Sequence, residues 1–102
     1  MCIRDSSSGD WFHAPPVEGT LVVNVADLLS RWTNGLYKST PHRVVNQSGK
    51  ERLSIVLAFD PNPETYINPA DIFGETEKSL SDPITCGDYL IWRFGKAFSY
   101  RK

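Results

Sequence analysis

The chain has 102 residues, of which 40% are hydrophobic and 23% charged, and its net charge is −1. These values are ordinary for a globular protein and exclude a strongly basic chain, so we expect no nucleic acid as a partner. No apolar run approaches the roughly 20 residues that a membrane-spanning helix needs, and no signal peptide is recognisable. We therefore expect no membrane partner either.

The first residues differ in character from the rest of the chain. Residues 1–10, MCIRDSSSGD, are polar and rich in serine, with no strand or helix periodicity. We expect this segment to be disordered or non-native and residues 11–102 to form the folded part. Cys2 and Cys86 have no spacing typical of a metal site, and nothing in the sequence indicates an oxidising compartment. The prediction is two free thiols and a cytoplasmic location.

Three segments have the composition of β-strands. Trp11–Ala14 is short and aromatic, and it stops at a pair of prolines that cannot donate to a ladder. Residues 20–25 are mostly β-branched, which favours a strand. Residues 52–59 alternate between two faces, and four large apolar side chains make up the face that we expect to pack: Leu53, Ile55, Leu57 and Phe59.

Two helices are predicted. Residues 28–32 favour a short helix with Asp27 as its N-cap and an Asn-Gly pair just after its end. Residues 86–98 favour a longer helix with Thr85 as its cap and a broad aromatic face for docking. Residues 64–82 between them show no regular pattern.

Candidate binding residues lie in the middle of the chain. His42 begins a short predicted strand, residues 42–46, and a polar turn then leads to Arg52 and Ser54 on one face of the next strand. A guanidinium offers a planar fork of donors and a hydroxyl offers one more, so this pair suits a carboxylate. On the residues alone, an arginine that reaches solvent and a histidine that is merely hydrogen-bonded remain alternatives. The sequence also leaves open whether the turn makes a hairpin or carries the chain to another sheet.

Three linked segments carry a family resemblance: GTLVVNVADLL, RWTNGLYKSTPHRVVN and ERLSIVLAFDPN. They resemble the C-terminal half of the isopenicillin N synthase-like iron(II)- and 2-oxoglutarate-dependent oxygenases, and the resemblance runs from Trp11 to Arg101. It implies a mainly β fold, the C-terminal part of a double-stranded β-helix (jelly roll), with a short internal helix and a C-terminal helix. It also implies that His42 is an iron ligand and that Arg52 and Ser54 bind the far carboxylate of 2-oxoglutarate.

The sequence departs from the family pattern at a few positions. Leu53 and Val56 stand where an aromatic residue and a proline are common, and Ala26 stands where glycine is usual. The family's H-x-D motif, which supplies the other iron ligands, would fall before residue 1. The other histidine, His13, has no acidic residue two positions on, so we expect it to be structural. The chain thus resembles a fragment of a dioxygenase, and we expect it to be inactive alone.

The resemblance implies a function for the whole protein. A small organic substrate would be oxidised by O₂ at iron(II), while 2-oxoglutarate is converted to succinate and CO₂. Two alternatives remain open. Arg52 and Ser54 would hold a carboxylate of the substrate instead of 2-oxoglutarate, or the chain would be a non-catalytic jelly-roll module. An H-x-D motif upstream of His42 would favour the enzyme over the module.

Overall fold

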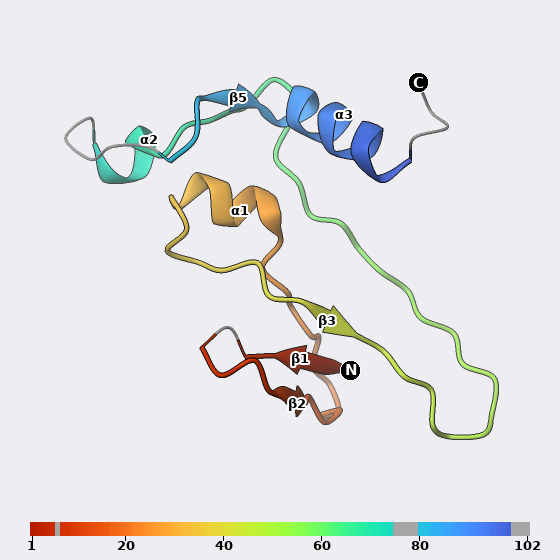
Figure 1. Ribbon diagram of the computed structural model, residues 1–102. Coiled ribbons are helices and arrows are strands. Elements are labelled where there is room, and N and C mark those ends of the chain that lie inside the picture. The colour runs from red at the N-terminus through yellow and green to blue at the C-terminus, as the bar shows by residue number, and fades with distance from the viewer. Residues whose placement is uncertain (6, 75–79, 99–102) are drawn as a thin grey trace.

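The computed structural model describes residues 1–5, 7–74 and 80–98 (Figure 1). These residues form two small antiparallel sheets and three helices. The first sheet has the order β2-β1-β3, with β1 at Cys2–Arg4, β2 at Trp11–His13 and β3 at His42–Arg43. The second pairs β4 (Tyr66–Ile67) with β5 (Ile84–Thr85). The helices are α1 (Asp27–Trp32), α2 (Ala70–Phe73) and α3 (Cys86–Ala97).

Within the described ranges, no helix is both long enough and apolar enough to cross a membrane. The short internal helix and the C-terminal helix that the resemblance implies are both present. Part of the segment predicted to be irregular, residues 75–79, lies outside the described residues, as does Arg101, the last residue of the resemblance. The rest of that segment holds β4 and α2, and β5 follows it.

The start of the chain forms the middle of the first sheet. Residues 2–4, for which the sequence favours disorder, make up β1, which pairs with β2 on one side and β3 on the other. Two further backbone hydrogen bonds extend these ladders, from Ala14 N to Met1 O at 2.8 Å and from Arg4 N to Pro41 O at 3.0 Å. β1 is ordered because both of its edges are paired, a non-local effect that composition does not show.

Asp5 organises the turn between β1 and β2. Its carboxylate accepts hydrogen bonds from the Ser7 hydroxyl and from the backbone N–H groups of Ser7 and Ser8. These bonds, the one from the Ser7 hydroxyl foremost, lower the pKa of Asp5. Gly9 adopts a left-handed φ of 77° and donates to Asp5 O at 2.9 Å, which closes the turn. This polar segment, whose composition is typical of a loop, therefore forms a defined turn through local side-chain hydrogen bonds.

Two predicted strands do not form in the structure. Residues 20–25 and 52–59 have no ladder partner, and Figure 1 shows residues 52–59 as an open trace that leads from the first sheet towards α3. The predicted packing face of the second segment is exposed, with Ile55 at 100% and Leu53 at 96%. A strand needs a partner for its N–H and C=O groups, and the described part of the chain offers neither segment one. The predicted strand 42–46 is likewise paired only over His42–Arg43.

Helix α1 begins one residue earlier than predicted. Ala26 is its N-cap and Asp27 is its first helical residue, so the prediction of Asp27 as the cap is wrong. The Asp27 carboxylate instead pairs with Arg93 of α3 at 3.0 Å, and because both side chains are about half exposed the pair contributes little stability. Asn34 and Gly35, with φ of 54° and 82°, end the helix in left-handed conformations as predicted.

Helix α3 is capped as predicted. The Thr85 hydroxyl accepts a hydrogen bond from Asp88 N at 3.2 Å, and the helix runs to Ala97. Only part of its aromatic face docks, because Tyr89 is buried whereas Trp92 and Phe94 remain about half exposed. The four buried hydrophobic residues of the described core come from α1, β4 and α3: Leu28, Ile67, Cys86 and Tyr89. Both cysteines are free, which confirms that prediction, and burial raises the pKa of the Cys86 thiol.

The first turn of α3 packs closely against the segment before β4. A Cβ at Gly87 would lie 3.2 Å from both Cβ and O of Pro63, and Gly87 N already donates to that oxygen at 2.9 Å. We therefore expect Gly87→Ala to lower the free energy of unfolding by about 1 kcal/mol or more, although alanine is the better helix former. Gly95→Ala in the same helix meets open space and is expected to raise it by about 0.5–1 kcal/mol.

Urea denaturation of the two variants beside the unmodified chain checks this pair. Both substitutions add the same methyl group to the same helix, so the helix propensity term cancels between them. Equal midpoints for Gly87→Ala and Gly95→Ala would show that the contact with Pro63 imposes no constraint.

Candidate functional site

The register of the first sheet assigns His42 to one face. Residues directly opposite in antiparallel strands lie on the same face, and successive residues of a strand lie on opposite faces. Ile3 of β1 pairs with His42 of β3 and with Phe12 of β2. Ile3, Phe12 and His42 therefore share one face of the sheet, which we call the His42 face.

The opposite face carries the other histidine. Cys2 pairs with His13 on one side and with Arg43 on the other, and Trp11 lies two residues before His13 in the same strand. The Arg43 guanidinium lies 4.2 Å from the centroid of the Trp11 ring, which is direct evidence that these side chains share a face. Because His13 and His42 face opposite sides of the sheet, they are poorly placed to hold one metal ion. This supports the expectation that His13 is structural.

The His42 ring is exposed and held by one contact. Its Nδ1 lies 3.2 Å from the carbonyl oxygen of Thr40. A carbonyl oxygen accepts and does not donate, so this contact requires the proton on Nδ1 and leaves the lone pair of Nε2 free in the neutral ring. Metal-ligating histidines usually donate their other ring N–H to an acceptor such as a backbone carbonyl, so this contact is compatible with a ligand role. Sequence reasoning missed this acceptor, because no pattern marks a backbone carbonyl.

Arg52 and Ser54 follow a tight polar turn. Asn46 closes this turn by donating from Nδ2 to Lys50 O at 2.7 Å and by accepting from the Ser48 hydroxyl at 2.7 Å. No ladder forms across the turn, so it is not a hairpin, and the following segment leaves the sheet (Figure 1). Arg52 and Ser54 are exposed, and within the described ranges no hydrogen bond or ion pair joins either of them to His42. In the described part of the chain, no hydrogen bond or ion pair therefore brings the three predicted site residues together.

A full set of metal ligands is not present in the described part of the chain. No group of three or more His, Cys, Asp or Glu side chains there is arranged to hold a metal ion. His42 fits one position of an iron site, since a neutral imidazole is a suitable ligand for iron(II). The described residues therefore fit one ligand position and not a complete site.

From this we expect the isolated 102-residue chain not to bind iron(II) stoichiometrically. A single imidazole does not compete with water and buffer, because tight binding comes from several preorganised donors acting together. Equilibrium dialysis against iron(II) and 2-oxoglutarate without oxygen, followed by metal analysis, measures this. One iron per chain that is lost in His42→Ala but kept in His13→Ala would contradict the expectation and would mean that further ligands assemble around His42.

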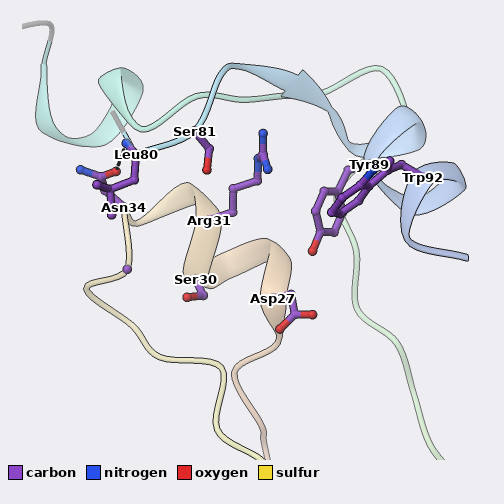
Figure 2. A pocket seen from close by; sticks show the side chains of 9 residues that line it. Asp27, Ser30, Arg31, Asn34, Leu80, Ser81, Tyr89 and Trp92 are labelled. Atoms are coloured by element: carbon purple, nitrogen blue, oxygen red, sulfur yellow. Dashed lines mark hydrogen bonds between the residues drawn. The ribbon is translucent and has the colours of Figure 1, made fainter. Parts of the chain in front are cut away.

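The recess between α1 and α3 has a different character. It has a volume of about 280 Å³, and Figure 2 shows side chains of both helices around it. Arg31 donates from Nη2 to Asp82 O at 2.8 Å, and its guanidinium lies 5.7 Å from the centroid of the Tyr89 ring. Burial, and then the charge of Asp27, raise the pKa of Tyr89, while Arg93 and Arg31 oppose this shift. None of the predicted site residues lines this recess, which we interpret as the junction that holds α1 against α3.

The sequence model of the 2OG-Fe(II) oxygenase superfamily matches residues 1–61, more than half of the chain. The chain belongs to this superfamily. The matched region includes all three predicted site residues, His42, Arg52 and Ser54. It also includes the residues of β1, so the first ten residues are part of the family match. No solved structure matches the chain.

Curated relatives of the chain include an oxidoreductase and hydroxylases from several organisms. A probable iron/ascorbate oxidoreductase of Dictyostelium discoideum is 40% identical over 90% of the chain and 29% of its own length. Feruloyl CoA ortho-hydroxylase 1 of Arabidopsis thaliana is 35% identical over 98% of the chain and 28% of its own length. A homoarginine-6-hydroxylase of Glycine max is 48% identical over 63% of the chain and 19% of its own length. The chain thus spans less than a third of the length of these relatives.

Proposed function

We propose that this chain is the C-terminal part of an iron(II)- and 2-oxoglutarate-dependent dioxygenase that oxidises a small organic substrate. In such a reaction one atom of O₂ enters succinate, CO₂ leaves 2-oxoglutarate, and the other oxygen atom enters the substrate. The observation that carries the proposal is the superfamily match over residues 1–61, which covers His42, Arg52 and Ser54 together. The relatives described above are named as an iron/ascorbate oxidoreductase and as hydroxylases, which supports an oxidation of the same class.

In this proposal His42 supplies an imidazole to the metal through Nε2. The contact of Nδ1 with Thr40 O orients the ring and fixes the tautomer that leaves Nε2 unprotonated. Iron(II), when bound, supplies open coordination positions for the keto acid and O₂. No group of three or more ligand side chains occurs among the described residues. The proposal therefore takes the remaining ligands from the H-x-D motif that the family resemblance places upstream of His42.

Arg52 and Ser54 would bind the far carboxylate of 2-oxoglutarate. In the strand that we propose for residues 52–59 of the whole protein, residues two apart point to the same side, so the Arg52 fork and the Ser54 hydroxyl would face one anion. Their exposure in the structure leaves both side chains available for it. An oxygenase that uses this pair for a substrate carboxylate is the competing assignment.

We further propose that the fold of the whole domain is a jelly roll. The β2-β1-β3 sheet would form one wall, with the His42 face turned inwards, and residues 52–59 would belong to the opposite wall. The alternating apolar side chains and unpaired backbone of that segment, and of residues 20–25, support this arrangement.

The two free thiols support a reducing location such as the cytoplasm, which fractionation of the source cells would test.

A turnover assay on the whole protein tests the function. The expected result is release of CO₂ and succinate from 2-oxoglutarate that requires iron(II) and O₂. Oxygen uptake that needs iron(II) but continues without 2-oxoglutarate would favour the competing assignment of Arg52 and Ser54. A purified whole protein that neither binds iron(II) nor consumes oxygen would identify a non-catalytic module and end the proposal.

A further inference from the structure

The other two paired residues on the His42 face, Ile3 and Phe12, are both apolar. Ile3 lies directly opposite His42, and Phe12 lies one strand further on. Adjacent strands are about 4.8 Å apart, so both side chains are within reach of a small molecule bound beside His42. Phe12 is 56% exposed and is not part of the buried core, so its ring is free to contact such a molecule.

The charged side chains of this sheet lie on its other face. Arg4 and Arg43 share that face with Trp11, and Arg43 is engaged over the Trp11 ring. Among the paired residues of the three strands, the His42 face carries no acidic or basic side chain apart from the imidazole itself. A guanidinium or ammonium group of a ligand that bound against the His42 face would lose its hydrating water without gaining a carboxylate partner, which is unfavourable. An aromatic ring or an aliphatic chain would gain from the same contact.

We propose that Ile3 and Phe12 form an apolar wall beside the metal position and bind an aromatic or aliphatic part of the substrate. The proposal rests on the proposed function, because it needs a substrate bound next to His42. The proposal distinguishes between two kinds of substrate that the relatives' names mention. A feruloyl thioester would present an aromatic ring to the apolar wall, which is favourable, whereas homoarginine would present a cation.

Equilibrium binding to the whole protein, loaded with iron(II) and 2-oxoglutarate without oxygen, tests this. The probes are feruloyl-CoA, a panel of aromatic acids, and homoarginine as the cationic probe. We expect the aromatic probes to bind more tightly than homoarginine. Phe12→Ala should weaken the best aromatic probe by about tenfold, since a large part of one ring contact is lost, while Phe12→Leu retains most of the affinity.

His13→Ala is the matched control, because His13 is adjacent and exposed but lies on the opposite face. It should leave the affinity for every probe unchanged. A titration of 2-oxoglutarate on each variant shows that the variant is folded and its cosubstrate site intact. If the unmodified protein binds no 2-oxoglutarate, the proposed function fails and this inference fails with it. If 2-oxoglutarate binds but no aromatic probe does, if homoarginine binds more tightly, or if Phe12→Ala changes nothing, the wall alone is refuted.

Discussion

Replacing Arg52 with alanine in the whole protein should raise the KM for 2-oxoglutarate by about 100-fold. The substitution removes a charge-assisted, two-pronged hydrogen bond to the far carboxylate, an interaction worth about 1.5–3 kcal/mol or somewhat more when bidentate. Arg52→Lys should recover only part of the loss, because an ammonium keeps the charge but not the planar fork. Ser54→Ala should have a smaller effect, about fivefold, since it removes a single neutral donor. Initial rates at varied 2-oxoglutarate measure all three.

Lys50 offers a matched control for this series. It lies in the turn just before Arg52 and is likewise exposed, so Lys50→Ala removes a positive charge of the same region without touching the proposed clamp. A KM for 2-oxoglutarate that is the same in Arg52→Ala, Lys50→Ala and the unmodified protein would disprove the carboxylate-binding role. If Arg52→Ala instead raises only the KM of the organic substrate, Arg52 binds a carboxylate of that substrate, as the competing assignment states.

Replacing His42 with alanine should abolish stoichiometric iron binding by the whole protein and, with it, turnover. Loss of a direct ligand should weaken binding by more than the roughly 10- to 100-fold that loss of a supporting partner costs. Metal analysis after dialysis without oxygen measures the loss independently of activity. His13→Ala is expected to keep one iron per chain, because that ring lies on the other face of the sheet. Full iron occupancy in His42→Ala would remove His42 from the metal site.

The elements that could be predicted from the sequence are those fixed by local interactions. Thr85 caps α3 by accepting a hydrogen bond from the residue three positions later, and Asn34 and Gly35 end α1 through their left-handed backbone conformations. Composition predicts a strand at residues 20–25, and the alternation of side chains between two faces predicts one at residues 52–59. A strand depends on a partner that is remote in sequence, and neither segment has one within the described residues. The same dependence made β1 unpredictable, since its two partners lie at Trp11–His13 and His42–Arg43.

For the candidate site, too, the sequence predicts some features and not others. The family resemblance identifies His42, Arg52 and Ser54 by residue type and position, and the roles assigned to them remain predictions. The environment of His42 could not be inferred from the sequence. Thr40 contributes a backbone carbonyl, and Ile3 joins the site through strand register, in a segment that composition marks as disordered. Register is a property of two strands together, so a single segment does not reveal it.

The position of β1 between β2 and β3 sets an order in which the first sheet can fold. The β1–β2 hairpin closes a loop of about ten residues, whereas β1 and β3 are about forty residues apart. Each doubling of loop length adds about 0.6 kcal/mol to the entropic cost of closing the loop. The pairing of β1 with β3 therefore costs about 1.2 kcal/mol more in loop closure than the pairing of β1 with β2. The hairpin therefore forms first and serves as the template on which β3 docks. His42 acquires Ile3 as its neighbour only in that later step, so we expect the surroundings of the proposed metal ligand to be completed by the pairing of β3 with β1.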